Sequence, residues 1–151
     1  RTQPLSPLDE LLAACGRGDA DAARRLTSAA LIAELSQTDR LLLCDAAASD
    51  RVATVEACVA AGWPVGDLDG MGATAMHHVA MHGRVELVRA LLGAGSDVTI
   101  RDKEHNATPL GWAVFGADHV AAPDGDYVAV VNTLSDAGLP PPDTRNAAGS
   151  R

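Results

Sequence analysis

Two stretches of this 151-residue chain match each other in register at a separation of 33 residues. The first, AASDRVATVEACVAAGWPV, begins at Ala47, and the second, AMHGRVELVRALLGAGSDV, begins at Ala80. Six apolar or glycine positions coincide: Ala47 with Ala80, Val52 with Val85, Val55 with Val88, Val59 with Leu92, Gly62 with Gly95 and Val65 with Val98. A fixed period of this length is typical of arrays in which each unit buries its apolar face against the next. We therefore expect a stack of similar units.

Each unit has the pattern of two helices and a loop. Apolar residues such as Val85, Val88 and Leu92 fall at helical spacing. A glycine follows them, where a helix commonly ends in a left-handed conformation. The segment DLDGMGAT (67–74) offers Asp and Gly residues for tight turns and Thr74 as the N-cap of the next helix. The pattern predicts helix, turn, helix and an ordered loop.

The segment GATAMHHVAMHGRVELVRALLGAGSDV (72–98) resembles the ankyrin repeat. That family is marked by G-x-TPLH-x-AA-x-x-G, followed by V-x-x-LL-x-x-GA-D-V. Here Ala75 and Met76 replace the Pro-Leu pair, and the next unit keeps Thr-Pro-Leu (108–110) with Gly111 in place of the histidine. The resemblance implies an all-α ankyrin-repeat solenoid of stacked helix-turn-helix units with β-turn loops.

The resemblance covers about residues 8–139. It divides them into four units, about 8–35, 36–68, 69–101 and 102–139, between an N-terminal extension (1–7) and a disordered tail (140–151). The spacing from Gly95 to Gly138 is 43 residues, which indicates an insertion near 116–126. Insertions into repeat loops often carry function.

Bulk composition excludes several classes of partner. The net charge is −8, so the chain as a whole repels nucleic acid. No apolar run approaches the roughly 20 residues that cross a bilayer. The three cysteines form no CxxC pair, which favours a reducing cytoplasm. We expect a cytoplasmic protein with no nucleic-acid or membrane partner.

Three of the five histidines lie within six residues. In the family the histidine at the position of His77 ties neighbouring loops together. His78 and His82 are four residues apart and share a helix face, but the sequence offers no third ligand and no Glu of an H-E-x-x-H motif. We expect no metal site and no cofactor.

His78 departs from the family pattern, which has an apolar residue there. The aligned residues in the adjacent units are Asp45 and Trp112, and stacked repeats place aligned positions side by side. The sequence therefore predicts a ladder of Asp45, His78 and Trp112. Asp45 and His78 are either a structural polar pair or candidate catalytic residues, with His78 as general base. An enzyme or small-molecule pocket, with Trp112 and a lid formed by 116–126, is the less favoured alternative.

The resemblance implies a scaffold that binds a partner protein or peptide through its loop tips and concave helix face. The carried-over contact positions are Arg40, Ala48, Ser49, Gly70, Met71, Ala73, Met81, His82, Lys103, Glu104, His105, Ala107, Phe115 and Gly116, with Trp112 beside them. Met81 and Phe115 are the expected apolar anchors. A regulatory module of a larger enzyme is a further alternative.

Overall fold

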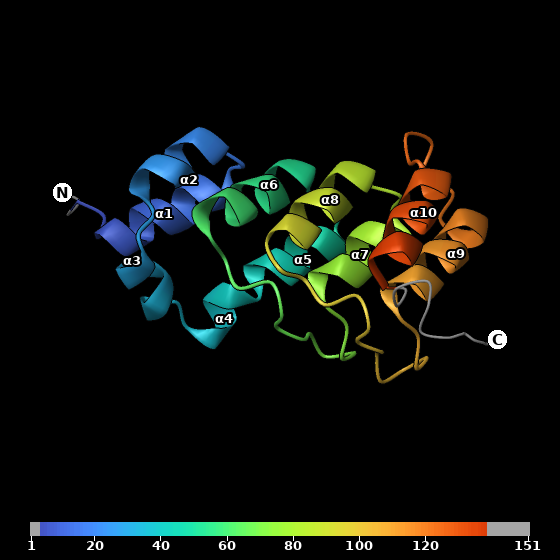
Figure 1. Cartoon of the computed structure of the whole chain (residues 1–151). Helices are drawn as coiled ribbons and strands as arrows, with labels where there is room; N and C mark the ends of the chain where they lie inside the picture. Colours follow the sequence, from blue (N-terminus) through green and yellow to red (C-terminus); the bar gives the residue numbers. More distant parts are fainter. Residues whose placement is uncertain (1–3, 139–151) are drawn as a thin grey trace.

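The computed structural model describes residues 4–138, which form ten α-helices and no β-strand. Four pairs of helices follow one another along the chain, with two short helices between the first and second pairs (Figure 1). The helices are α1 (Pro7–Gly16), α2 (Ala20–Leu26), α3 (Ala29–Glu34), α4 (Gln37–Arg40), α5 (Leu42–Ala48), α6 (Val52–Ala61), α7 (Ala75–Met81), α8 (Val85–Gly93), α9 (Pro109–His119) and α10 (Tyr127–Gly138).

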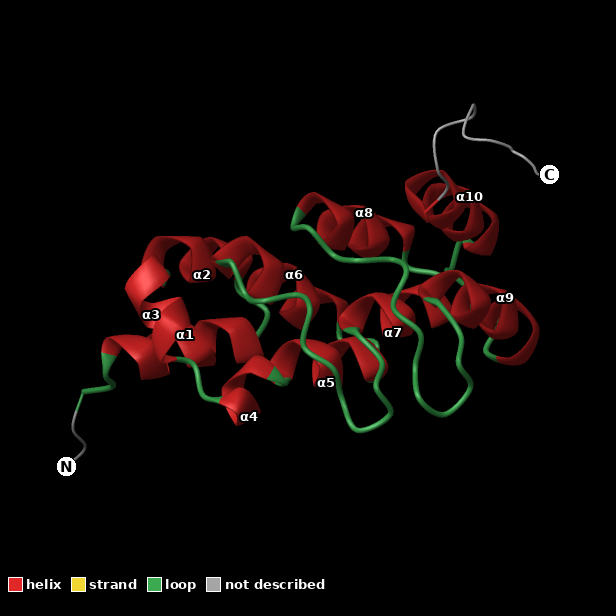
Figure 2. Ribbon diagram, turned by 60° about the horizontal axis from the view of Figure 1, so that its bottom comes forward, coloured by secondary structure: helices red, strands yellow, loops and turns green. Residues whose placement is uncertain are grey.

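The helix pairs stack into two layers. Helices α1, α5, α7 and α9 form one layer, and α2, α6, α8 and α10 form the other (Figure 1). The long loops from α6 to α7 and from α8 to α9 project on the same side of the stack, as Figure 2 shows. The predicted all-α solenoid of helix-turn-helix units is confirmed.

Helix ends lie where the sequence signals place them. Thr74 and Thr108 are the N-cap residues of α7 and α9. Gly62 and Gly95 follow α6 and α8 with φ angles of 94° and 97°, in the left-handed region that glycine adopts without a steric penalty. These local signals set the length of each helix and direct the chain into the next loop.

Small residues fill much of the space between the layers. Ala46, Ala57, Ala75 and Ala80 are each 0% exposed, and so is the larger Leu91. A methyl side chain lets neighbouring helices approach closely while still removing apolar surface from water. The alanine-rich composition therefore produces close helix packing, and few positions in the core have room for a larger side chain.

The two shortest helices, α3 and α4, were not predicted. Each begins after a serine: the Ser28 hydroxyl accepts a hydrogen bond from the N–H of Leu31, and the Ser36 hydroxyl accepts one from the N–H of Asp39. These caps stabilise single helical turns that carry no repeat pattern. They stand where the later units have an extended loop.

The insertion in the last unit is part helix and part loop. Helix α9 has 11 residues whereas the equivalent α7 has 7, so the first part of segment 116–126 continues the helix. The rest runs against the turn between α7 and α8, where the N–H of Asp126 donates to the carbonyl of Gly83 at 2.8 Å. The unit boundaries stay predictions, and the expected tail at 140–151 lies outside the described residues.

Candidate partner-binding groove

His77 links two loops, as predicted. Its Nδ1 accepts the backbone N–H of Thr74 at 3.0 Å, and its Nε2–H donates to the carbonyl of Ala107 in the next loop at 3.0 Å. Burial lowers the pKa of His77, although the hydrogen bond to Ala107 opposes the shift. A neutral imidazole with one accepting and one donating nitrogen fits both contacts. Its role is structural.

The predicted pairing of His78 with Asp45 is wrong. The Nε2–H of His78 donates to the carboxylate of Asp69 at 2.7 Å, and its Nδ1 is buried with no hydrogen-bond partner among the described residues. Asp45 is exposed on α5. Asp69 lies in the loop that precedes α7, so this pair forms within one unit.

Trp112 forms the equivalent contact one unit further along. Its indole N–H donates to the carboxylate of Asp102 at 3.0 Å, and the carboxylate is 2% exposed. The Trp112 ring meets the His78 ring edge to face, with centroids 5.2 Å apart. The predicted neighbourhood of His78 and Trp112 is thus present, but each ring is fixed by the carboxylate of its own loop.

The two loop carboxylates also organise the turns in which they lie. Asp69 accepts the backbone N–H groups of Met71 and Ala73, and Asp102 accepts those of His105 and Ala107. Asp69 and Asp102 are 33 residues apart, one repeat period. The prediction failed for Asp45 because the repeat period reports neighbours across units and carries no information on contacts between a loop and its own helix. The recurrence of an aspartate after one period, at Asp69 and Asp102, was the sequence signal that could have identified these two carboxylates.

Both carboxylates are stabilised in the ionised form. Burial raises the pKa of Asp69, but the hydrogen bonds from His78 and from backbone N–H groups outweigh it and bring the pKa below its ordinary value. Burial likewise raises the pKa of Asp102, and the hydrogen bonds from Trp112, Ala107 and His105 lower it to about 2. Each carboxylate therefore carries a negative charge near neutral pH.

A groove of about 400 Å³ opens beside these rings. Its lining is mostly apolar and comes from two loops and two helices: Met71, Met81, His105, Ala107, Gly111, Trp112 and Phe115. The Phe115 ring is 52% exposed and stacks on His119 with centroids 4.1 Å apart. A largely apolar hollow with few polar groups has the form of a ligand or partner site.

The groove brings together six of the residues predicted as contact positions, namely Met71, Met81, His105, Ala107, Trp112 and Phe115. Gly111, which replaces the family's histidine, also lines it and was not predicted. A Cβ built on Gly111 would lie 3.2 Å from the Ala107 Cβ, so a side chain at this position would crowd the groove wall. The departure from the hallmark at Gly111 was the signal that could have found it.

The other predicted partner-binding residues lie outside the groove. Arg40 forms a two-pronged ion pair with Asp67, with N–O distances of 2.7 and 2.8 Å. Ser49 ends α5, and His82 ends α7 with its Nε2 3.2 Å from the carbonyl of Ala48. Lys103 and Glu104 are exposed on the loop before α9. The binding roles of these residues stay predictions.

The structure lacks the arrangement that the alternative requires, a catalytic or small-molecule pocket of Asp45, His78 and Trp112 beneath a lid. Asp45 does not contact His78, and no residue of 116–126 lines the groove. Instead, Asp124 pairs with Arg84 at 2.8 Å, and the N–H of Asp126 donates to the carbonyl of Gly83, so the inserted loop is held against the turn after α7. Segment 116–126 is therefore not a lid over Trp112.

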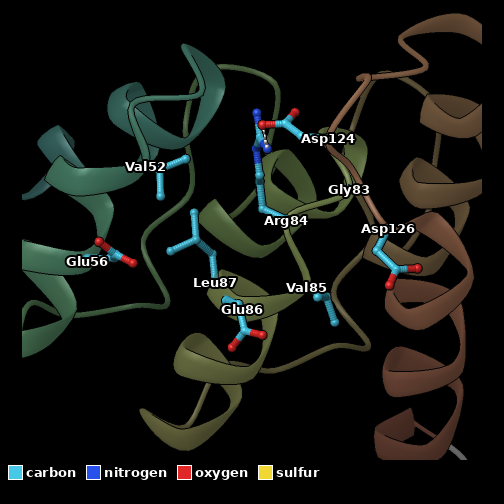
Figure 3. A pocket seen from close by; sticks show the side chains of 9 residues that line it. All are labelled: Val52, Glu56, Gly83, Arg84, Val85, Glu86, Leu87, Asp124 and Asp126. Carbon is cyan, nitrogen blue, oxygen red and sulfur yellow. Dashed lines mark ion pairs between the residues drawn. The ribbon is translucent and has the colours of Figure 1, made fainter.

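A second hollow, of about 360 Å³, lies between α6, α8 and the inserted loop. Figure 3 shows Arg84 directed toward Asp124 at one side of it, with Glu56 on α6 well separated from both. The hydrogen bonds that Arg84 donates to Asp50 and Asp124 raise the pKa of Arg84 above its ordinary value. The one cation in this lining is thus committed to an ion-pair network.

Two kinds of site are absent from the part of the chain that the structure describes. Within residues 4–138 no group of three or more His, Cys, Asp or Glu side chains could hold a metal ion. Over the same residues no helix has the length and apolar character needed to cross a membrane.

Comparison with known protein families identifies the family of the chain. The family described as ankyrin repeats (many copies) matches residues 43–92 and 76–128, which together are more than half of the chain. The chain belongs to the ankyrin repeat family. Ankyrin repeats generally mediate protein–protein interaction, and stacked repeats create an extended surface for it.

A segment of this ankyrin chain is similar to part of a larger protein, the palmitoyltransferase Hip14 of Drosophila melanogaster. The two sequences are 37% identical over 62 residues, which is 41% of this chain and 10% of that protein. The chain thus covers only a small fraction of the length of this relative.

Proposed function

We propose that this ankyrin array is an interaction scaffold that binds a protein or peptide partner in the groove between Met71, Met81 and Phe115. The observation that carries the proposal is an aromatic ring left 52% exposed in the wall of an otherwise well-packed array. Aromatic and methionine side chains supply large, adaptable apolar contacts, and such anchors commonly dominate binding free energy.

The groove is large enough to hold a side chain from a partner. Its volume of about 400 Å³ accommodates one or two large side chains. Its walls come from two successive loops and the first helices of two units, so a bound segment would contact both units at once. Binding at such a junction requires the stacked array rather than any single repeat.

A peptide-display selection tests the proposal. The immobilised chain is used to select binders from a random peptide library, and each binder is retested on the Met81→Ala and Phe115→Ala variants. We expect both variants to weaken binding at least about tenfold while their melting curves stay close to that of the parent. Val128→Ala on α10 is the matched control, because Val128 is 74% exposed and does not line the groove.

Two results would count against the groove. Binders that are retained by both variants would move the binding site elsewhere on the array. A large fall in melting temperature for Met81→Ala and Phe115→Ala would show that these side chains serve the core instead.

A second candidate is that the array is a regulatory or recruiting module within a larger enzyme. The similarity to a segment that makes up 10% of a palmitoyltransferase favours it. Sequencing the complete reading frame tests this candidate, since an adjoining catalytic domain would support it and an array flanked by no other domain would exclude it.

A further inference from the structure

The charges beneath the groove are unbalanced. Asp69 and Asp102 hydrogen-bond to backbone N–H groups and to the rings of His78 and Trp112. Among the residues that the structure describes, no lysine or arginine forms an ion pair with either carboxylate, and His78, 2.7 Å from Asp69, forms one only when its imidazole is protonated. Hydrogen bonds from neutral donors stabilise a carboxylate without cancelling its charge. Two carboxylates therefore lie behind the groove wall, and neither is paired with a lysine or arginine.

The groove wall contains no permanently charged side chain, and His105 is the one lining residue that can become cationic. None of the seven lining residues is a lysine, arginine, aspartate or glutamate. The Trp112 indole N–H points at the Asp102 carboxylate, 3.0 Å away, in a site where the carboxylate is 2% exposed. A hydrogen bond to an anion in a poorly solvated site is strengthened and polarises its donor, here the indole N–H. An electron-rich ring attracts cations through its face.

The remaining lining residues suit the stem of a long side chain. Met71 and Met81 present flexible thioethers, and Phe115 presents a half-exposed ring. Lysine and arginine combine an apolar stem with a cationic head, so they can fill an apolar hollow and place the charge against an aromatic ring.

Charges further from the groove agree with this preference. Lys103 and Glu104 are adjacent and exposed on the loop, and as opposite charges they largely offset each other at a distance. Over the whole chain 20 acidic residues face 12 basic ones, for a net charge of −8. A basic partner is thus attracted both by the molecule as a whole and by the groove wall.

We propose that the groove accepts an arginine or lysine side chain of a partner segment, with the stem along Met71 and Met81 and the cationic head against the half-exposed Phe115 ring, near the buried Trp112. This inference rests on the proposed function, because it names the chemistry of the partner at the same groove. The inference goes beyond the proposed function because it excludes a purely apolar anchor.

The test uses short peptides of one host sequence, Ala-Ala-X-Ala-Ala, acetylated and amidated at the ends. The central residue X is arginine, lysine, leucine or citrulline, the last being an uncharged structural mimic of arginine. Binding to the whole chain is followed by NMR through the indole N–H signal of Trp112. The indole N–H of Trp63, which donates to the backbone carbonyl of Asp39 away from the groove, is the internal control.

The expected result is a saturable shift of the Trp112 signal with the arginine and lysine peptides. We expect the citrulline and leucine peptides to bind about three- to tenfold more weakly, and the advantage of arginine to shrink as salt is added. The Trp63 signal should stay unchanged. A citrulline or leucine peptide that binds as tightly as the arginine peptide overturns the inference.

A pair of charge variants tests the origin of the preference. Asp69→Asn keeps the shape of the side chain, and its amide N–H can donate to the His78 Nε2 when the imidazole proton lies on Nδ1, but it removes one partly buried charge. We expect it to weaken the arginine peptide about threefold. Asp45→Asn is the matched control, because Asp45 is an exposed carboxylate that contacts neither the groove nor His78. An equal loss in both variants would assign the preference to overall charge and overturn the proposed role of the groove wall.

Failure of this inference is distinguishable from failure of the proposed function. If no host peptide moves the Trp112 signal, or if display selection yields groove-dependent binders with neutral anchors, the cationic preference is wrong and the peptide-binding groove stands. If selection yields no binder that depends on Met81 or Phe115, both proposals are wrong.

Discussion

Gly116 of α9 lies directly against the backbone carbonyl of Met81 at the end of α7. A Cβ atom built on Gly116 would overlap that carbonyl oxygen, which is a backbone atom and cannot rotate away. The absence of a side chain at this position therefore sets how closely the last helix pair approaches the third. Because Met81 and Phe115 both line the groove, the same contact also sets the width of the groove.

The first prediction concerns this contact. Gly116→Ala should destabilise the chain by about 2–3 kcal/mol, because the overlap forces α9 away from α7. In an open helix the same change normally stabilises by about 0.5–1 kcal/mol. Gly93→Ala in α8, where a Cβ meets no atom within 4 Å, provides that comparison. Urea denaturation of the two variants measures the difference, and equal stabilities would contradict the close approach.

A second prediction concerns the ion pairs around Arg84. Its guanidinium bonds to Asp50 at 2.8 Å on one side and to Asp124 at 2.8 Å on the other. Asp50 also has a φ of 57°, a conformation that is unfavourable for a residue with a side chain. We expect the Arg84–Asp50 pair to contribute about 1 kcal/mol in a double-mutant cycle of Arg84→Met with Asp50→Asn.

The Asp124 side of the network should contribute less. The Asp124 side chain is 74% exposed whereas that of Asp50 is 27% exposed, so solvent screens the Asp124 pair more strongly. A coupling energy for Asp124 equal to or larger than that for Asp50 would argue against this ranking.

The third prediction concerns acid. The folded-state pKa of Asp102 is lowered to about 2 from an ordinary value near 4, mainly through hydrogen bonds that overcome the opposing effect of burial. A carboxyl group with a lowered pKa contributes stability that is complete above the unfolded-state pKa. That contribution is lost as the pH falls from about 4 toward 2, and it amounts to about 2 kcal/mol. The free energy of unfolding, measured by urea denaturation from pH 5 to pH 2, checks it.

Asp102→Asn should make this part of the pH profile flatter. The variant starts from a lower stability at pH 5, because an amide NH2, which is a donor, replaces the carboxylate oxygen that accepts the N–H of His105. A variant whose stability falls with acid as steeply as that of the parent would show that other carboxylates produce the effect.

The fourth prediction compares the two tryptophans. Trp112→Phe removes the indole donor of a buried carboxylate and should cost about 1–3 kcal/mol. Trp63→Phe removes a longer hydrogen bond, 3.3 Å, to the uncharged carbonyl of Asp39. Its polar contribution should therefore be smaller, about 1 kcal/mol. Thermal or urea unfolding of both variants decides the order, and a larger cost for Trp63→Phe would reverse it.

The repeat period and the family register were sufficient to predict the four helix pairs and much of the groove. Apolar spacing, Thr74 and the glycines after α6 and α8 gave the helix ends, because these signals act within a few residues of each other. Family register supplied Met81, His105 and Phe115, since equivalent positions in stacked units share one face of the array. The groove depends on the most regular part of the sequence.

Contacts that break the period were not predictable in the same way. The pairing of His78 with Asp69 joins a loop to its own helix, and the aligned position in the preceding unit is Ser36, which caps α4 instead. Asp45, which aligns with His78, therefore has no loop carboxylate in the position that Asp69 occupies relative to His78. Similarly, α3 and α4 depend on serine caps and carry no apolar repeat, so the register of the other units gave no sign of them.

The hydroxyl group of Tyr127 joins three segments of the array: it donates to the carbonyl of Met81 and accepts the N–H of Ala122. In a linear array the last unit has only one neighbour and is the first to fray. With Tyr127, the Arg84 network and Gly116 all fastening α9 and α10 onto α7 and α8, the last two helix pairs should open together as one cooperative unit. Amide hydrogen exchange would then show similar protection in α8 and α10, and a partner held by Met81 and Phe115 would bind to a part of the array that does not fray separately.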